Sequence, residues 1–525
     1  MILKIFQSLL FLLIVCCFNL PITIAQAPSS KKPNVIFILA DDLGRGMLSY
    51  YGQKYITTPN IDRIAKEGIS FDHSYAGVYC APSRASIVTG YSDCHYEKYR
   101  ITSGGIYEKV AKAELTDAQA QSKVDSAIGK EPNITYLAEV FKTAGYTTAE
   151  FGKLDYGFAT STKQMKNHGW DFYYGYYDHV MCHGFYPPFL HENGHLVKIA
   201  GNTHADAGKA GEWGDPISEK ARSDMEGKAI YSQDLFLDKI LSFIRTHKNE
   251  PFFLFHPTQL PHGPVAIKSI HSEVLFNPNL TQIEKEYASM VKKLDDNVGI
   301  IIQELKKLGL EKNTIIVFSS DNGHEIYYSN KGRVEKPYKN IKTGKLFNNV
   351  TDRYYSNLAG DIFDGNNGMA GIKRSNWEGG SRVPLFIRWP GKYKAGYKAN
   401  QLVANYDLLT TFADLLGIKT KDKKDGISFL PALNLEQKFE GHREIAFVSF
   451  LGPALVTKTG WKLRYQASTK RYELYYLPND YKENENLAEK YPDRVNALKS
   501  ILITKCNGDI NNGVFSDSKN VLNVE

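Results

Sequence analysis

The sequence predicts an α/β protein with a large, mostly parallel β-sheet covered by helices on both faces, followed by a smaller C-terminal α+β unit with a short antiparallel sheet. Continuous apolar runs without polar alternation are typical of strands buried on both faces, and amphipathic helical stretches lie between these runs. After about residue 430 the pattern changes to short strands separated by turns. These observations together predict the two-part architecture.

Two of the apolar runs end in polar side chains that carry oxygen. The first run covers residues 34–40 and the second covers residues 314–320, and both are expected to be buried strands. Ligands of open α/β sheets bind beyond the carboxyl ends of the strands. Hard oxygen donors suit Ca²⁺ or Mg²⁺ and not Zn²⁺, so we expect a Ca²⁺ site, with Mg²⁺ as the alternative. The predicted ligands are Asp41, Asp42, Asp321 and Asn322.

Helices are predicted where apolar residues recur every three or four positions. Residues 287–308 carry this pattern most clearly, and Gly309 closes them. Further helices are expected at residues 136–144 and 408–416, and further buried strands at residues 251–255 and 383–389. The C-terminal strands are expected at residues 444–450, 461–465 and 471–477.

Three polar stretches without periodicity are expected to be long loops, which in compact domains are usually lids or binding loops. They cover residues 92–131, 194–226 and 324–368. Residues 170–195 are instead dense in aromatic side chains and histidine. We expect this segment either to form a carbohydrate cleft together with the long insertion at residues 324–368, because aromatic faces stack on sugar rings, or to anchor the core and its loops.

The composition excludes several classes of protein. With 525 residues, 12% aromatic residues, 21 Pro and a mean hydropathy of −0.35, the chain is neither disordered nor collagen-like nor a polytopic membrane protein. The 64 Lys and Arg residues against 57 Asp and Glu residues give a net charge of +7 without a basic block, which argues against nucleic-acid binding. This mild excess is compatible with an anionic substrate.

The first 27 residues predict a signal peptide. Lys4 precedes an apolar stretch, and residues 25–27, Ala-Gln-Ala, provide a small-residue cleavage site. The length and the flanks of the stretch do not suit a stable membrane span. We therefore expect an exported protein, periplasmic or secreted. Two of the six cysteines would leave with the signal peptide, and the remaining four are too few for a disulfide scaffold.

The run Cys-Ala-Pro-Ser-Arg over residues 80–84 carries the most reactive pattern in the chain. Proline and serine suit the first turn of a helix, which would place Cys80 just before a helix N-terminus, where backbone N–H groups favour anions. Cys80 is then a nucleophile or an anion-binding position with Arg84 folded back beside it. On spacing alone, a disulfide between Cys80 and Cys94 is an equally open alternative.

This run, closed by Thr89 and Gly90, resembles the signature of the type I sulfatases, whose cysteine is oxidised after translation to formylglycine. Eight other segments resemble the family in the same order, and although one short motif can match by chance, five in order do not. The eight segments are residues 34–42, 135–145, 252–264, 321–323, 373–384, 407–417, 425–426 and 473–475. The resemblance implies an alkaline-phosphatase-like fold, with a sulfatase catalytic domain over residues 28–435 and a C-terminal subdomain over residues 436–525.

The resemblance also implies roles for individual residues. Hydrated formylglycine at Cys80 would contact the metal, attack sulfur in line and then expel sulfate, while Arg84 helps to hold it. Lys153 and Lys373 would neutralise sulfate oxygens, and His262 would protonate the leaving oxygen. The implied partners are a formylglycine-generating maturation enzyme and a sulfated polysaccharide or oligosaccharide substrate.

One departure from the family pattern follows the first catalytic lysine. Sulfatases usually carry a histidine two residues after it, but residues 152–157 are Gly-Lys-Leu-Asp-Tyr-Gly, with Asp155 at that position. Either Asp155 points elsewhere or another side chain takes over the role of the histidine. We expect His183 as the substitute, with His179 second, because both lie in a stretch that resembles the next active-site loop of the family.

Two other functions stay open. The alkaline-phosphatase-like fold also hosts phosphate and phosphonate ester hydrolases, although these relatives usually use two metals and a Ser or Thr nucleophile. A catalytically degenerate carbohydrate-binding protein is the non-enzymatic alternative, and Asp155 gives it some support.

Overall fold

The structure is a computed structural model that describes residues 32–130, 132–204, 224–328, 334–335, 339–340, 361–436 and 439–524. The predicted signal peptide, residues 1–27, lies outside these ranges. Contacts join Pro33–Glu525 into one unit. Within the described ranges, no helix has both the length and the apolar character that a membrane crossing requires.

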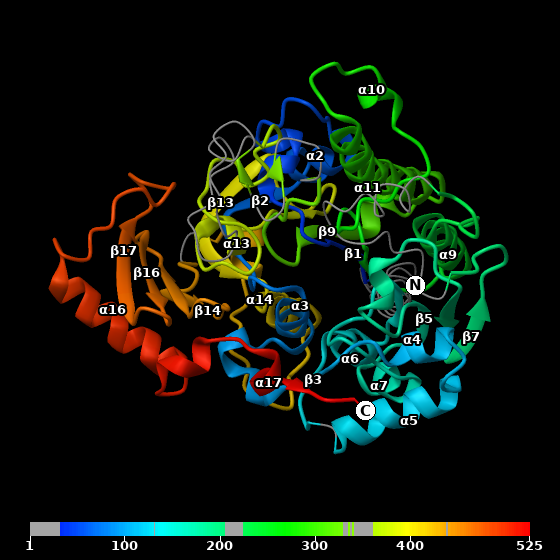
Figure 1. The fold of residues 1–525 in the computed structure, drawn as a ribbon, viewed down its shortest axis with the longest axis horizontal. Coiled ribbons are helices and arrows are strands. Elements are labelled where there is room, and N and C mark those ends of the chain that lie inside the picture. Colours follow the sequence, from blue (N-terminus) through cyan, green and yellow to red (C-terminus); the bar gives the residue numbers. More distant parts are fainter. Residues whose placement is uncertain are drawn as a thin grey trace, which may run out of the picture. The chain divides into compact units, whose positions relative to one another are not determined.

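A ten-stranded sheet forms the centre of the fold, in the order β13-β2-β12-β9-β1-β8-β4-β5-β6-β7 (Figure 1). Its strands are β1 (Asn34–Ala40), β2 (Ile69–Tyr75), β4 (Thr147–Gly152), β5 (Phe172–Gly175), β6 (Phe189–Glu192), β7 (His195–Lys198), β8 (Phe252–Pro257), β9 (Thr314–Ser320), β12 (Leu385–Arg388) and β13 (Tyr397–Ala404). Strands β9, β1, β8, β4 and β5 run parallel, whereas β12, β6 and β7 pair antiparallel with their neighbours. The predicted mostly parallel sheet is confirmed.

Strands β1 and β9 end level with each other. Their register runs from Asn34 opposite Thr314 to Ala40 opposite Ser320. Every residue of both strands is buried, which explains why the two runs are continuously apolar. The oxygen-bearing side chains that follow the two strands therefore emerge side by side at one edge of the sheet.

Helices cover the sheet in two layers (Figure 1). One layer consists of α2 (Pro59–Lys66), α9 (Ser232–Thr246) and α11 (Gln282–Lys307), and the other of α3 (Cys80–Thr89), α6 (Leu137–Thr143) and α14 (Asp407–Leu416). Helix α11 begins earlier than the periodicity predicts, because Thr281 and Glu284 form a capping box that fixes its first turn. The predicted helices are confirmed, with bounds shifted by a few residues.

The expectation of an irregular loop over residues 92–131 is wrong in part. This segment contains α4 (Ile106–Ala111) and α5 (Asp117–Ile128). Helix α5 starts at a capping box between Thr116 and Gln119 and buries only three side chains. Its apolar face is too sparse to be visible in the sequence.

The other two predicted loops are described only in part. Strand β7 lies at the start of the stretch 194–226, and residues 205–223 lie outside the described residues. Of the stretch 324–368, the structure describes residues 324–328 and 361–368, together with the short strands β10 (Val334–Glu335) and β11 (Lys339–Asn340).

A second, antiparallel sheet forms the C-terminal part of the chain, as predicted, in the order β14-β15-β16-β17. Its strands are β14 (Glu444–Phe447), β15 (Ala454–Thr457), β16 (Trp461–Gln466) and β17 (Arg471–Tyr476). Helix α16 (Pro492–Lys505) contacts β15 and β16. The sequence analysis missed β15, which has only four residues. The boundary between residues 435 and 436 stays a prediction.

A buried ion cluster joins the two sheets. Lys462 on β16 lies 3.0 Å from Glu378 and 3.0 Å from Glu483, and all three side chains are fully buried. Tyr75, the last residue of β2, donates a hydrogen bond of 2.8 Å to Glu378. Because Glu378 lies only five residues after Lys373, this cluster also anchors the segment that carries the predicted sulfate-binding lysine.

We expect Lys462→Met to lower the free energy of unfolding by about 3–5 kcal/mol, because it removes the cation that two buried carboxylates share and leaves only Arg382, 3.5 Å from Glu378, to compensate them. Chemical denaturation measures this loss. Lys458→Met is the matched control, since Lys458 pairs with Glu440 at an exposed site and its loss should cost less than about 1 kcal/mol. Equal losses in the two variants would contradict the structural role of Lys462.

Candidate active site

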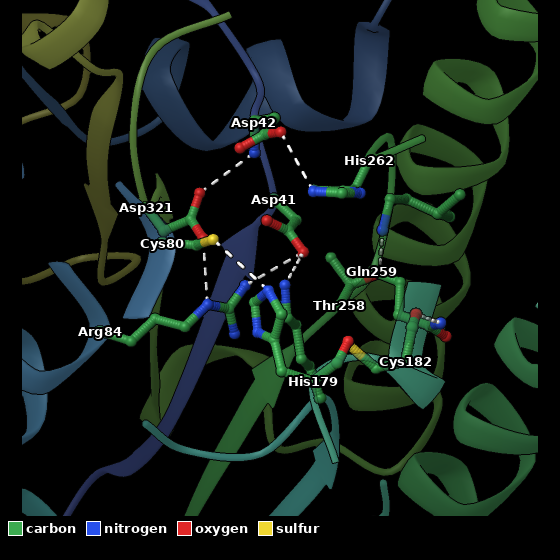
Figure 2. A network of polar contacts seen from close by, with 12 residues as sticks. Asp41, Asp42, Cys80, Arg84, His179, Cys182, Thr258, Gln259, His262 and Asp321 are labelled. Carbon is green, nitrogen blue, oxygen red and sulfur yellow. Dashed lines mark hydrogen bonds and ion pairs between the residues drawn. The ribbon is translucent and has the colours of Figure 1, made fainter. Parts of the chain in front are cut away.

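The turn after β1 brings its two aspartates against the end of β9. The backbone N–H of Asp42 donates to Asp321 (3.1 Å) (Figure 2). The side-chain amide of Asn322 donates to Asp42 (2.7 Å). Asp42 has a φ of 60°, a left-handed conformation that aspartate tolerates better than most residues. All four predicted metal ligands are thereby brought together, and none of them is accessible to solvent.

Gly323 lets a further segment approach this edge. A Cβ atom added at Gly323 would lie 1.8 Å from the carbonyl oxygen of Gly379, so no other residue fits without moving the backbone. The N–H of Gly323 donates to the carbonyl of Gly380 (2.9 Å). This close contact holds the residues that follow Lys373 beside the end of β9.

Helix α3 contributes Cys80 and Arg84. Cys80 is the first residue of the helix, one position later than the predicted placement just before it, and Tyr79 is the N-cap. The Ser83 hydroxyl donates to the carbonyl of Asp321, and the Nε atom of Arg84 donates to the Asp321 carboxylate (3.0 Å). These bonds tie the first turn of α3 to the end of β9. Neither terminal nitrogen of Arg84 has a hydrogen-bond acceptor among the described residues.

The structure does not pair Cys80 with Cys94. Among the described residues the four cysteines are free thiols, and all of them are buried. Cys94 packs with Cys506 in the hydrophobic cluster beneath the C-terminal sheet. Cys80 instead faces the polar cluster, with its sulfur 3.7 Å from Nε2 of His179.

Two buried lysines neutralise the aspartates of the β1 turn. Nζ of Lys153 lies 2.6 Å from Asp41, and Nζ of Lys373 lies 2.7 Å from Asp42. Burial would lower the pKa of Lys373, but the Asp42 carboxylate outweighs it and raises that pKa. Burial would likewise raise the pKa of Asp41, but the cations around it, Lys153 first among them, hold it well below its usual range. Both ion pairs are therefore charged.

The pKa of Asp321 is shifted in the opposite direction to the pKa values of Asp41 and Asp42. Burial and the nearby Asp41 carboxylate raise the pKa of Asp321 to about 7, although Arg84 opposes the shift. One carboxyl of the cluster thus holds its proton weakly near neutral pH. A divalent cation would replace that proton, since carboxylates bind metals in their ionised form.

The oxygen cluster fits a hard divalent cation. One carboxylate oxygen of Asp41 and the amide oxygen of Asn322 have no hydrogen-bond partner among the described residues, although both are buried. Donor atoms of Asp41, Cys80 and Asp321 lie within 4.8 Å of one another. Unpaired buried oxygens of this kind are the ligands that Ca²⁺ and Mg²⁺ prefer, so a cation would satisfy them.

Three histidines face this cluster. His262 lies 3.4 Å from Asp42 and 3.3 Å from Nζ of Lys373. The ring of His183 stacks on that of His262 at a centroid distance of 4.2 Å, and the ring of His179 lies 4.5 Å from that of His183. Burial lowers the pKa of His262 to about 4 and the pKa values of His179 and His183 well below the usual range. All three rings are therefore neutral at pH 7.

Asp155 points away from the site. Its carboxylate accepts hydrogen bonds from His168 (2.6 Å), from the indole of Trp170 (3.1 Å) and from the backbone of Tyr156 (2.8 Å). These partners lie in the turn before β5 and beside Asp155 itself, and the carboxylate is fully buried. Of the two possibilities left open by the sequence, the structure bears out the first: Asp155 has a structural environment of its own.

Most aromatic side chains of the segment 170–195 lie in the core and do not line a sugar cleft, and most of the insertion expected to complete the cleft lies outside the described residues. Six of the aromatic side chains of residues 170–195 are at most 3% exposed and belong to the main core, which confirms the anchoring alternative and rules out stacking of these rings on a substrate. They are Tyr173, Tyr174, Tyr176, Tyr177, Phe185 and Tyr186.

The sequence analysis missed two residues at the site. The hydroxyl of Tyr327 donates to Asp42, but Tyr327 lies in a stretch without periodicity that gave no signal of a role. Cys182 lies between the two site histidines, and its thiol donates to the carbonyl of His179 (2.9 Å). The position of Cys182 between two nearby histidines was the one sequence pattern that could have indicated a role for it.

Comparison with known proteins agrees with this geometry. The family model described as Sulfatase matches residues 33–418, and the model described as N-sulphoglucosamine sulphohydrolase, C-terminal, matches residues 372–506. The chain is 31% identical to the N-acetylgalactosamine-6-sulfatase of Rattus norvegicus over 416 residues, which are 78% of this chain and 67% of the rat protein. It is 27% identical to the N-acetylgalactosamine-6-O-sulfatase of Bacteroides thetaiotaomicron, covering 90% of this chain and 93% of that protein.

A solved structure extends the likeness to the fold. A sulfatase of Bacteroides thetaiotaomicron, studied in connection with glycosaminoglycan metabolism, superposes with a TM-score of 0.68 at 25% identity, covering 91% of this chain and all of that one. The fold and the site together define a carbohydrate sulfatase with an alkaline-phosphatase-like large domain. The chain belongs to the sulfatase family and is a sulfuric ester hydrolase.

We expect Asp155→Asn to destabilise the protein without removing its activity. An amide in place of the carboxylate cannot accept all three hydrogen bonds, so the free energy of unfolding should fall by about 1–3 kcal/mol. Turnover of the folded enzyme should stay within about threefold of wild type, because Asp155 does not face the cluster. Denaturation and steady-state kinetics measure the two effects.

Asp238→Asn on the exposed face of α9 is the control and should change stability by less than about 0.5 kcal/mol. A large loss of turnover in Asp155→Asn with unchanged stability would show that Asp155 takes part in the chemistry.

Proposed function

We propose that the enzyme removes sulfate from a sulfated polysaccharide or oligosaccharide, with formylglycine derived from Cys80 as the nucleophile and with bound Ca²⁺, or alternatively Mg²⁺. The single observation that carries the proposal is the convergence of Lys153, Lys373 and Arg84 on a buried oxygen cluster next to Cys80. Three cations around one nucleophile position suit a substrate group with several anionic oxygens.

The thiol of Cys80 is a poor nucleophile in this environment. Burial raises its pKa, although Lys373 and Lys153 oppose the shift. A cysteine that acted as a thiolate would need a lowered pKa. The site therefore favours a converted residue at position 80, which requires a formylglycine-generating maturation enzyme as partner.

The divalent cation would be held by the carboxylates of Asp41, Asp42 and Asp321 with the amide oxygen of Asn322, and would stabilise negative charge on the nucleophile and on sulfate. Each lysine has three N–H donors. One bond from each lysine to an aspartate leaves further donors free for sulfate oxygens. The terminal nitrogens of Arg84 have no hydrogen-bond acceptor among the described residues, although Nη2 lies 3.5 Å from Asp41, and they add a second source of donors from the α3 side.

His262 is suited to protonate the leaving oxygen. Its Nδ1 atom lies 2.5 Å from the carbonyl of Gly263, which can only accept, so the proton of the neutral ring sits on Nδ1. Its Nε2 atom is then an acceptor 3.3 Å from the ammonium of Lys373. A proton taken up from solvent at Nε2 would pass to the departing alkoxide, which restores the neutral ring, while the ammonium of Lys373 keeps its charge.

We further propose that His179 replaces the histidine missing at Asp155. His179 is the ring next to Cys80 and is neutral, so its Nε2 atom can accept a proton from the nucleophile. His183, the first expectation from the sequence, is better suited to orient His262, because the two rings stack almost parallel, at 5°. With His179 in this position, Asp155 no longer supports the degenerate alternative.

The first substrate to test is a 6-O-sulfated N-acetylgalactosamine glycan, because relatives that align over most of the chain act on N-acetylgalactosamine 6-sulfate according to their names. We propose that the enzyme is exported and reaches this glycan in the periplasm or outside the cell, as the signal peptide predicts.

We expect converted, Ca²⁺-loaded enzyme to release sulfate from at least one member of a panel of defined sulfated glycans, and Cys80→Ala to release none above background. Ion chromatography of sulfate measures both. Cys94→Ala is the matched control, because Cys94 is a buried free thiol outside the site and should leave turnover within a few fold of wild type. Cleavage of phosphate esters with no activity on any sulfated glycan would contradict the proposal.

We expect Ca²⁺ to stabilise the protein and Asn322→Ala to abolish most of this effect, because the variant loses a ligand without a change of charge. Cation at 100 times its Kd adds about 2.7 kcal/mol to the free energy of unfolding, which appears as a higher Tm.

Asn313→Ala is the control at the opposite end of β9 and should keep the Ca²⁺ effect. The same Ca²⁺-dependent rise in Tm in Asn322→Ala as in wild type would show that the cation binds elsewhere.

A further inference from the structure

A second group of possible metal ligands lies next to the oxygen cluster, and its donors are of a different kind. His179, Cys182 and His183 each offer one nitrogen or sulfur atom, and these three atoms lie within 4.8 Å of one another. All three residues come from one short loop that ends in the 3₁₀ turn Met181–His183. Figure 2 shows Cys182 beside His179, whose ring lies next to Cys80 and Arg84.

The nitrogens of this group are available. Nδ1 of His179 and Nε2 of His183 are buried and have no hydrogen-bond partner among the described residues. His179 is 95% buried and Cys182 is 99% buried. A buried imidazole nitrogen without a partner is costly, and a metal ion would supply the partner that the protein does not.

The spacing of the three residues suits one ion. His179 and His183 are four residues apart, Cys182 is three residues after His179, and the loop brings one donor atom of each within 4.8 Å of the others. Imidazole nitrogen and thiolate sulfur are the donors that Zn²⁺ prefers, whereas Ca²⁺ and Mg²⁺ require oxygen. The donor atoms of this loop therefore favour Zn²⁺ over the Ca²⁺ or Mg²⁺ that suits the oxygen cluster.

We propose that His179, Cys182 and His183 form a zinc-binding site that is separate from the Ca²⁺ cluster and that switches the enzyme off when it is filled. Three protein ligands leave one coordination position for an exogenous ligand. Binding itself does not depend on the proposed substrate. Inhibition rests on the proposed function, because it requires His179 and His183 to serve the sulfatase reaction.

Zinc binding exchanges a proton for a metal. The S–H bond of Cys182 breaks, a Zn–S bond forms, and the proton leaves to buffer; no oxidant or reductant takes part. The hydrogen bond from the thiol to the carbonyl of His179 is lost in the same step. Burial raises the pKa of the Cys182 thiol to about 12, so this proton is present at pH 7 and its release is measurable.

Inhibition follows from what the two histidines contact. His179 is the ring beside Cys80, and His183 is the ring stacked on His262. A metal ion that engages both rings would hold them away from the reacting groups. Zn²⁺ would therefore lower turnover even when the oxygen cluster is saturated with Ca²⁺.

The test uses Co²⁺ as a spectroscopic probe for zinc, in the full chain carrying Cys80→Ala and with Ca²⁺ at saturation. Cys182 is then the only thiol among the site residues. We expect one equivalent of Co²⁺ to give a thiolate-to-cobalt charge-transfer band, and Zn²⁺ to displace it with release of about one proton. Cys182→Ser should abolish the band and weaken Zn²⁺ binding by about tenfold or more.

Cys94→Ser is the matched control and should leave the band unchanged. His183→Ala serves as a second variant if Cys182→Ser does not fold, and it should also weaken Zn²⁺ binding. Absence of the charge-transfer band, or unchanged Zn²⁺ affinity in both variants, would overturn the zinc site.

A filled zinc site without inhibition of converted wild-type enzyme would overturn only the switch. Absence of sulfatase activity in zinc-free enzyme would instead contradict the proposed function and leave the binding result standing.

Discussion

The balance of charge at the carboxyl ends of β1 and β9 is the constraint on which the rest of the site depends. Three aspartates are fully buried there, and Arg84, Lys153 and Lys373 are buried against them. Taking either set of charges out of water alone would cost several kcal/mol per ion. The fold therefore has to deliver both sets to one place, from helix α3, from the turn after β4 and from the segment behind Gly323.

This balance also couples cation binding to anion binding. Three carboxylates and three cationic side chains cancel when all are ionised, and burial together with the Asp41 carboxylate raises the pKa of Asp321 to about 7. A divalent cation adds positive charge and engages the carboxylates, so that lysine and arginine donors become available to sulfate. Electrostatic complementarity to an anionic group is thus a consequence of filling the oxygen cluster.

Much of this arrangement could be predicted from the sequence, because it depends on local pattern. The apolar runs that precede Asp41 and Asp321 predicted the first and last residues of β1 and β9 correctly, and the parallel pairing of these strands brings their ends together. Helix α5 and strand β15 were not predictable, because one has a sparse apolar face and the other is only four residues long.

The surroundings of the site could not be predicted from the sequence, because they depend on contacts between segments that are distant in the chain. The role of Asp155 could not be assigned, since its partners His168 and Trp170 are defined only once β4 and β5 pair. The aromatic side chains of residues 170–195 predicted a cleft and a core equally well. Only packing distinguishes the two, and it places them in the core.

Sulfate release measured against the fraction of Cys80 converted to formylglycine tests most directly whether this charge-balanced pocket acts through a modified cysteine. Peptide mass spectrometry gives the converted fraction in the same preparations that are assayed on a 6-O-sulfated N-acetylgalactosamine glycan or another cleaved member of the panel. We expect turnover to rise in proportion to conversion and to vanish at zero conversion. Undiminished turnover in preparations whose Cys80 is entirely thiol would contradict the mechanism.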